Sequence, residues 1–244
     1  MDEPLHVQAS SKQAIHIATI NLVQHGVVQI HDLHVVNSDH AKAAHNTLAK
    51  VLSALDSRKL EYREQKETSF TFSDVASRDR GRVDVRYDMD RYAQLIETPL
   101  LRLIIASVLG DDYQVAFSGI VYSLADSVAQ AWHRDGPHLA TSDGPTAPAH
   151  ALTAFFPLCD VTEDRGSPQF IPGSHLLSDE VANTTDHHVV QFNPLAATDC
   201  VVFDYRLLHR GMPNVGSDTR PLMYVVFSVP HWCDDINFGT EPLL

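Results

Sequence analysis

Residues 200–209 read Cys-Val-Val-Phe-Asp-Tyr-Arg-Leu-Leu-His, an apolar run of strand length that closes on a histidine. The run belongs to a series of eight short apolar segments separated by Gly, Pro, Asn and Asp, which is punctuation typical of all-β domains. The eight segments are Tyr113–Ser118, Ile120–Leu124, Gln130–Arg134, Ala151–Leu158, Gln169–Ile171, His188–Phe192, Cys200–Tyr205 and Leu222–Val229. So many short strands with turns between them predict a mainly β jelly roll or sandwich and not a βαβ fold.

The first 110 residues differ in character, because their apolar residues recur at helical spacing. We expect helices over Gln13–His25, Ser38–Leu55 and Pro99–Leu109, and one early strand over Val27–Leu33. The length of 244 residues is within the range of one β domain. We therefore predict a single domain over residues 1–244, with residues 1–110 as mostly helical support and residues 111–230 as the jelly-roll core.

Two segments have the composition of loops. Arg58–Asp90 is polar and charged throughout, and its last third interleaves arginines with aspartates. This balance predicts a solvated loop outside the core, with an anion-binding lid as the alternative. Gly136–His150 is rich in Gly, Pro, Ser and Thr and is long for a hairpin, so we expect it at the rim of a binding mouth.

Composition excludes several classes of protein. Lysine and arginine total 18 against 31 aspartates and glutamates, and the net charge of −13 would repel nucleic acid and anionic membranes. The three cysteines are widely spaced, which favours neither a disulfide framework nor a zinc knuckle. Met1–Lys12 has no apolar signal region, and no apolar stretch approaches the length of a membrane span. We expect a soluble, cytoplasmic protein with a small-molecule substrate.

Three side chains can be assembled into one metal site on spacing grounds. His133 and Asp135 are two residues apart on an expected strand, so both project from the same face. His209 closes the apolar run 200–209 and is well placed as a third ligand if that strand neighbours the first. Two imidazoles and one carboxylate on one face of an octahedron leave three positions open, which is the arrangement of non-haem Fe(II) oxygenases.

An arginine follows this set at a suggestive distance. Arg220 stands 11 residues after His209, and a hairpin between them would turn at Asn214 and Val215, between Pro213 and Gly216. His209 and Arg220 would then face each other across two antiparallel strands.

Taken together, these motifs resemble the phytanoyl-CoA dioxygenase family of Fe(II)- and 2-oxoglutarate-dependent oxygenases, over roughly residues 130–227. The likeness rests on Gln130-Ala-Trp-His-Arg-Asp135, on Gly166–His175, on His209-Arg-Gly-x-x-Asn214 and on Arg220-Pro221. The resemblance implies a double-stranded β-helix core with His133, Asp135 and His209 as catalytic iron ligands. It also implies that Arg220 pairs with the distal carboxylate of 2-oxoglutarate, a role that suits a guanidinium fork.

Two further residues are candidates for the cofactor-binding pocket. Thr153 shares a face of its expected strand with Phe155, and both can line the space for 2-oxoglutarate. Gln130 precedes the first ligand by three residues, so a regular strand would turn it to the opposite face from His133.

The resemblance implies a dioxygenase that uses Fe(II), 2-oxoglutarate and O2 to oxidise a C–H bond of a small organic molecule, with release of succinate and CO2. Hydroxylation of a secondary-metabolite intermediate is the expected reaction. Family members that halogenate have Gly or Ala at the carboxylate position, and Asp135 argues against that chemistry. The alternatives are a hydroxylase of a fatty acyl-CoA thioester and a non-catalytic, cupin-like metal-binding protein.

Overall fold

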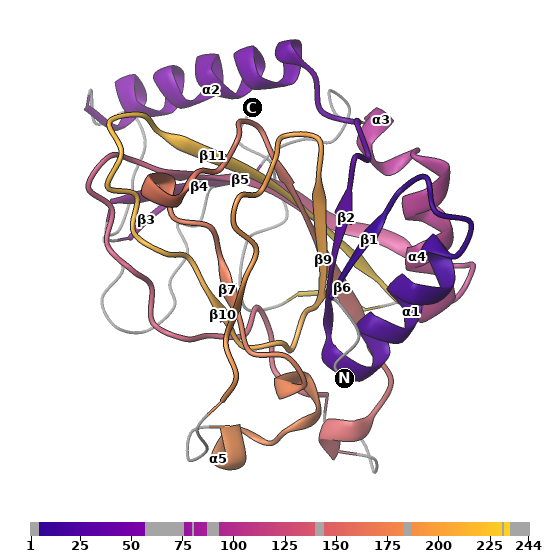
Figure 1. Cartoon of the computed structure of the whole chain (residues 1–244). Helices are drawn as coiled ribbons and strands as arrows, with labels where there is room; N and C mark the ends of the chain where they lie inside the picture. Colours follow the sequence, from indigo (N-terminus) through magenta and orange to yellow (C-terminus); the bar gives the residue numbers. More distant parts are fainter. Residues whose placement is uncertain are drawn as a thin grey trace.

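The computed structural model describes residues 5–56, 76–79, 81–86, 93–139, 144–182, 187–230 and 232–234. Its strands form two sheets (Figure 1). The larger has the order β1-β2-β9-β6-β11-β5-β4-β3, and the smaller has the order β10-β7-β8. The strands are β1 (His6–Gln8), β2 (Val27–His31), β3 (Ala76–Asp79), β4 (Arg82–Arg86), β5 (Gln114–Ser123), β6 (Ala151–Pro157), β7 (Gln169–Phe170), β8 (Val190–Gln191), β9 (Cys200–Asp204), β10 (His209–Arg210) and β11 (Arg220–Ser228).

Helices cover the outer face of the larger sheet. They are α1 (Ala14–His25), α2 (Ser38–Asp56), α3 (Ala93–Ile96) and α4 (Pro99–Leu109). The short α5 (Asp179–Ala182) lies apart from them, at the other end of the molecule (Figure 1). Figure 1 shows α2 crossing above β4, β5 and β11, while α1 and α4 lie together beside β1 and β2. The helices bury apolar faces against the sheet, and the Tyr122 hydroxyl on β5 donates to the Ala44 carbonyl of α2 at 2.8 Å. Every described helix is too short or too polar to span a bilayer.

Side chains along β11 point alternately to two layers. One layer is the apolar core between the larger sheet and the helices, which we call the outer core, and the other is a cavity inside the jelly roll. Met223, Val225 and Phe227 pack with the helices. The residues between them, together with Arg220, line a cavity inside the jelly roll: Leu222, Tyr224 and Val226. Because side chains alternate between the two faces of a strand, one strand supplies both layers. The mainly β jelly roll with supporting helices is thus confirmed.

The predicted elements agree with the structure in type and differ in detail. The three helices and the early strand lie where expected, within two residues at each end. Tyr113–Ser118 and Ile120–Leu124 were predicted as two strands, but they form the single strand β5. Gln130–Arg134 is not a regular strand, because His133 makes only an isolated bridge to His209.

The prediction that Arg58–Asp90 is a loop outside the core is wrong for its last third. Residues 82–86 form β4 in the larger sheet, where Val83 and Val85 are fully buried in the outer core. Arg82 is only 3% exposed, so the solvated-loop interpretation does not hold there. Residues 58–75, 80 and 87–90 of this segment lie outside the described residues.

The predicted hairpin between His209 and Arg220 is also wrong. His209 belongs to β10, which pairs with β7, whereas Arg220 begins β11, which pairs with β5 and β6. The turn itself falls at Asn214, whose Nδ2 donates to the carbonyls of Ser123, Leu124 and Asp218. The chain passes from one sheet to the other at this turn. His209 and Arg220 therefore reach the cavity from different sheets.

Gly119, in the middle of β5, leaves room for a side chain of the neighbouring strand β11. A Cβ at this position would overlap the Tyr224 hydroxyl and would lie 2.7 Å from the Val85 carbonyl oxygen. The Tyr224 ring, directly opposite on β11, thus lies across β5 where only a glycine leaves room.

Replacing Gly119 with alanine should therefore destabilise the protein by about 1–3 kcal/mol, as overpacking does in other cores. Chemical denaturation would measure the free energy of unfolding. In a Tyr224→Ala background the same substitution should cost less, because its main clash is gone. An equal cost in both backgrounds would contradict this account.

Candidate active site

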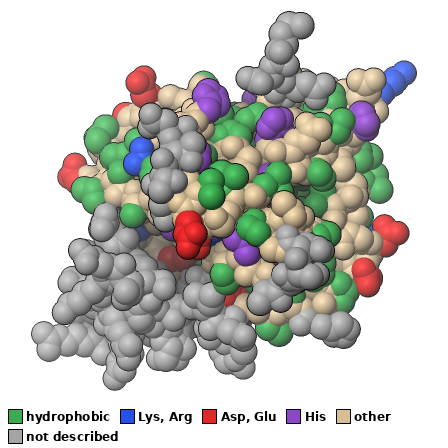
Figure 2. Space-filling view, turned by 90° about the horizontal axis from the view of Figure 1, so that it is seen from below, with side chains coloured by type: hydrophobic (Ala, Val, Ile, Leu, Met, Phe, Trp, Pro, Cys, Tyr) green, Lys and Arg blue, Asp and Glu red, His purple; other side chains and the backbone are tan. Residues whose placement is uncertain are grey.

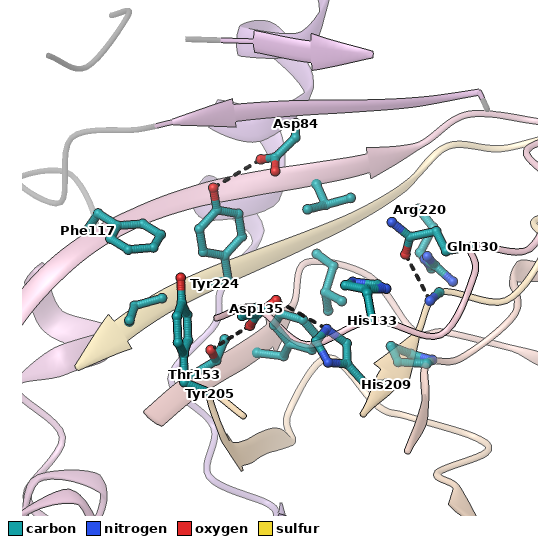
Figure 3. Close-up of a pocket in the computed structure, with 16 residues that line it drawn as sticks. Asp84, Phe117, Gln130, His133, Asp135, Thr153, Tyr205, His209, Arg220 and Tyr224 are labelled. Atoms are coloured by element: carbon teal, nitrogen blue, oxygen red, sulfur yellow. Dashed lines mark hydrogen bonds and ion pairs between the residues drawn. The ribbon is translucent and has the colours of Figure 1, made fainter. Parts of the chain in front are cut away.

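The three expected metal ligands are brought together by backbone hydrogen bonds between distant segments. The His133 N–H donates to the His209 carbonyl at 3.0 Å, and the His209 N–H returns a bond of 2.9 Å to His133. The Asp135 N–H donates to the Tyr205 carbonyl at 3.1 Å, which fixes the third residue. One ligand atom from each residue lies within 4.8 Å of the others (Figure 3). This group of three can hold one metal ion.

Each histidine ring is oriented by the backbone carbonyl of the residue two positions before it. Nδ1 of His133 lies 2.9 Å from the Ala131 carbonyl oxygen, and Nδ1 of His209 lies 3.1 Å from that of Leu207. An N–H at Nδ1 donates to each carbonyl, which leaves Nε2 with its lone pair for a metal. Such partners set the tautomer and the ring orientation of metal-binding histidines.

Aromatic rings enclose the His209 side. The His209 ring stacks on Phe170 with centroids 6.1 Å apart, and its centroid lies 4.8 Å from that of Phe203. Phe155, which lines the cavity as predicted, meets Phe203 edge-on at 4.8 Å. This wall excludes water from one side of the ligand set and strengthens the electrostatic interactions inside it.

The pKa shifts match a ligand set ready for a cation. Burial lowers the pKa of His133 to about 4, and the nearby His209 adds to this effect, so His133 is neutral at pH 7. Burial opposes ionisation of Asp135, but its neighbour His209 outweighs it and lowers the pKa of that carboxyl. His209 has its pKa raised, because the Asp135 carboxylate, 3.4 Å from Nε2, outweighs the effect of burial. A metal ion bound between His209 and Asp135 would replace the proton that the raised pKa favours on the His209 ring.

Thr153 holds the carboxylate of Asp135. It lies on β6, lines the cavity as predicted, and its hydroxyl donates to Oδ2 of Asp135 at 3.0 Å. Oδ1 is the oxygen that faces His209. The hydrogen bond therefore fixes the orientation of the carboxylate, with Oδ1 left toward His209.

Substituting Thr153 with valine, which keeps the shape and removes the hydroxyl, should weaken metal binding by about 10- to 100-fold. Titration with Mn(II) would measure the dissociation constant. Thr153→Ser is the matched control, since it keeps the donor and should bind metal like the parent. Unchanged affinity in the valine variant would refute the positioning role.

Arg220 occupies the other end of the cavity as a buried cation. It is 2% exposed; Nη1 donates to the Arg165 carbonyl at 3.0 Å and Nη2 to the Ser123 hydroxyl at 2.6 Å. Its Nε is buried without a hydrogen-bond partner, and no described carboxylate forms an ion pair with it. Burial first, and then the charge of Arg82, lower its pKa to about 9. A buried cation of this kind is satisfied by an anionic ligand.

Gln130 also lines the cavity, although a regular strand would have turned it away. Its Oε1 accepts a hydrogen bond of 2.9 Å from the Gly211 N–H. Since the segment is extended without regular pairing, the alternation rule does not apply to it. All six residues expected in the site, His133, Asp135, Thr153, His209, Arg220 and Gln130, thus lie around one cavity.

A sequence model of the family described as Phytanoyl-CoA dioxygenase (PhyH) matches residues 22–222, most of the chain. The chain belongs to this family. Its resemblance over residues 130–227, expected from the motifs alone, therefore extends into the helical half. The PhyH family uses Fe(II), 2-oxoglutarate and O2, the cofactors expected from the sequence.

Individual relatives agree with this assignment. Dioxygenase easH of Epichloe festucae var. lolii is 38% identical over 102 residues, which cover 41% of this chain and 55% of that protein. Dioxygenase hkm4 of Aspergillus hancockii is 29% identical over 108 residues, which cover 44% of this chain and 35% of that protein. The chain thus matches about half or less of the length of these curated relatives.

A solved structure has the same fold. The epimerase SnoN, in complex with Fe3+, alpha-ketoglutarate and nogalamycin RO, matches with a TM-score of 0.62 at 20% identity. The match covers 96% of this chain and 97% of that one.

The residues present fit the cofactors of the PhyH family. Two nitrogens and one carboxylate oxygen lie close enough to share an ion, and Nε2 of both histidines is the atom left for it. Arg220 lacks a counter-charge among the described residues, which a dicarboxylate such as 2-oxoglutarate would supply. His133, Asp135 and His209 would hold the iron, and Arg220 would hold the far carboxylate of the co-substrate.

Sequence reasoning missed several residues at this cavity. Asp84, Phe117, Tyr205 and Tyr224 line it, and the buried Arg82 lies beside it. The sequence Arg-Val-Asp-Val-Arg at 82–86 alternates charged and apolar residues, which is the period-2 signal of a strand. The high charge of Arg58–Asp90 favoured a loop and masked this strand pattern.

The remaining histidines lie outside the cavity in the part of the chain that is described. His175, 2% exposed, places Nε2 3.3 Å from the Val23 carbonyl oxygen, a structural contact between the short 3-10 helix Ser174–Leu176 and α1. The view in Figure 2, from below that of Figure 1, shows histidine side chains scattered over the surface. Two of the 15 histidines therefore account for the chemistry proposed below.

Proposed function

We propose that this protein is an Fe(II)- and 2-oxoglutarate-dependent dioxygenase that hydroxylates a C–H bond of a small organic molecule. The balanced reaction takes the substrate, 2-oxoglutarate and O2 to the hydroxylated product, succinate and CO2. The observation that carries the proposal is the presence, in one cavity, of the three candidate ligands and of a buried arginine without a carboxylate partner. A metal-binding protein without turnover has no use for that arginine.

When bound, the iron supplies the activation of O2 that couples decarboxylation of 2-oxoglutarate to oxidation of the substrate. The protein's residues do the positioning. The His133 and His209 rings are held by backbone carbonyls, and Asp135 is held by Thr153. Arg220 and Gln130 orient the co-substrate from one side, and the phenylalanines around His209 keep water away. The oxidised C–H bond is selected by how the rest of the cavity holds the substrate.

The substrate we propose is a secondary-metabolite intermediate. SnoN, whose fold this chain shares, was solved with nogalamycin RO, a small molecule. The alternative substrate, a fatty acyl-CoA, carries several phosphate charges, which the net charge of −13 disfavours.

Succinate formation tests the proposal. The purified protein, loaded with Fe(II) and supplied with 2-oxoglutarate and O2, should release succinate, and a true substrate should increase the rate. Chelation of iron should abolish the release. Iron bound at the site without any succinate, across a broad panel of small molecules, would favour the cupin-like binding protein instead.

A further inference from the structure

Strand β4 presents a carboxylate to the cavity close to the metal ligands. Because side chains alternate, Arg82, Asp84 and Arg86 share one face of β4, while Val83 and Val85 lie in the outer core. Asp84 lies opposite Val121 of β5, which in turn lies opposite Leu222 of β11, and all three line the cavity. Asp84 is therefore part of the cavity wall and not of the surface.

A tyrosine binds this carboxylate, and a phenylalanine packs against that tyrosine. The Tyr224 hydroxyl donates to Oδ1 of Asp84 at 3.1 Å, reaching it across Gly119. The Phe117 ring meets Tyr224 edge-on, with centroids 6.2 Å apart. Both rings line the cavity, so the pair faces the space where a substrate would lie.

This cluster lies away from the end that would hold the co-substrate. In Figure 3, Phe117, Tyr224 and Tyr205 lie on the opposite side of Asp135 and the histidines from Arg220 and Gln130. Arg220 and Tyr224 are four residues apart on β11, which corresponds to about 13 Å along a strand. A co-substrate anchored at Arg220 would thus leave the Tyr224 end for another molecule.

The titratable side chains at this end are acidic, and burial, with the charge of Asp135 adding to it, raises the pKa of Asp84 to about 7. A cation bound beside this carboxyl would favour its ionised form. Among the described residues, no lysine, arginine or histidine forms an ion pair with Asp84, and the charge that acts on it is that of Asp135. Tyr224 uses one acceptor position, whereas a carboxylate has about four. Arg86, on the same face of β4, lies over Phe117 with its guanidinium carbon 5.7 Å from the ring centroid, and not against Asp84. Among the residues that the structure describes, Asp84 therefore has no cationic partner.

We propose that Asp84, Tyr224 and Phe117 form a substrate subsite that receives a protonated amine. The carboxylate pairs with the ammonium group, and the aromatic rings contact the carbon atoms next to it and its positive charge. This inference rests on the proposed oxygenase function, because it names the substrate class of the same cavity. The amine anchors the substrate beside the metal ligands, and the C–H bond to be oxidised lies within a few bonds of that nitrogen.

Matched small probes test the subsite directly. We would use 2-phenylethylamine, 2-phenylethanol and 3-phenylpropionate, which share a ring and differ in the charge of the end group. The protein is loaded with Mn(II) and 2-oxoglutarate, and binding is followed by NMR, since the paramagnetic ion broadens the probe signals only near the site. The amine should bind at least about tenfold more tightly than the alcohol, because a charged partner strengthens a hydrogen bond. Equal affinities, or no binding of the amine, would overturn the proposal.

Two variants and a control locate the effect. Asp84→Asn keeps the shape and removes the charge, so the preference for the amine over the alcohol should disappear. Tyr224→Phe should reduce that preference less, since the carboxylate remains. Asp39→Asn removes the same charge from an exposed position on α2, where the side chain is 85% exposed, and should retain the full preference. An unchanged preference in Asp84→Asn would refute the subsite.

A separate absorption measurement distinguishes failure of the subsite from failure of the oxygenase assignment. Under anaerobic conditions, Fe(II) and 2-oxoglutarate bound together give a visible charge-transfer absorption. If the parent and Asp84→Asn both show this absorption while no probe discriminates, the amine subsite is wrong and the oxygenase assignment stands. If neither shows it, the proposed function itself fails.

Discussion

Replacing His209 with alanine should abolish iron binding and succinate formation. His209 offers one of the three candidate ligand atoms, and its backbone also holds His133 in place through two hydrogen bonds. Changes that only touch the partners of metal ligands already cost about 10- to 100-fold, so loss of a ligand should exceed that range. Metal content after loading and succinate release would measure the two effects.

The His209 variant needs a control for folding. The ring packs against Phe170 and Phe203, so alanine removes buried contacts as well as a ligand. His209→Gln keeps more of that volume and should lose iron as well, with a thermal unfolding midpoint closer to that of the parent. His34→Ala changes a histidine whose side chain is 65% exposed and should retain both metal and activity. Stoichiometric iron and full turnover in a folded His209→Gln protein would refute the ligand assignment.

Arg220→Met should separate stability from co-substrate binding. The buried guanidinium has an unpartnered Nε and no described carboxylate partner, so an apolar side chain of similar length should leave the ligand-free protein as stable or up to about 4 kcal/mol more stable. The same change should weaken 2-oxoglutarate binding by about 2–5 kcal/mol, which is about 30-fold or more. Thermal unfolding with and without 2-oxoglutarate would show both effects, because added co-substrate should no longer raise the midpoint.

Arg206→Met is the matched control for that experiment. Arg206 is equally buried, but its Nε and Nη2 bind both carboxylate oxygens of Asp204, at 2.9 and 2.8 Å. Its removal leaves a buried carboxylate without a partner and should cost about 3–5 kcal/mol of stability. If Arg220→Met were equally destabilised, or still bound 2-oxoglutarate like the parent, Arg220 would be a structural residue.

The subsite around Asp84 gives a physical meaning to the negative composition of the chain. Acidic residues exceed basic ones by 13, which first served to exclude nucleic acid as a partner. At the Asp84 end of the cavity the same imbalance is local, because Asp84 and Asp135 act on each other, whereas Arg82 and Arg220 donate to backbone carbonyls. A cationic substrate and a metal ion would both relieve it.

The candidate site residues that share the cavity could be picked out from the sequence because their signals are local or carried by motifs. The spacing of His133 and Asp135, the histidine that ends an apolar run and the arginine that follows it at a fixed distance are all visible in one dimension. Helix limits were equally accessible, since Gly26 and Gly110 follow the last helical residues of α1 and α4. The match of the PhyH family over residues 22–222 agrees with these patterns.

By itself, then, the sequence determined the fold class, the cofactor chemistry and the identity of the four principal candidates, His133, Asp135, His209 and Arg220. Only the tertiary structure decided which strands share a sheet. It placed β10 and β11 in different sheets and made β4 a strand of the larger sheet. The physical reason is that strand pairing depends on contacts between residues far apart in the chain. Alternating polar and apolar residues in the sequence show that one face of a strand is polar. Whether that face meets water or an enclosed cavity, as for Asp84, depends on the neighbouring strands.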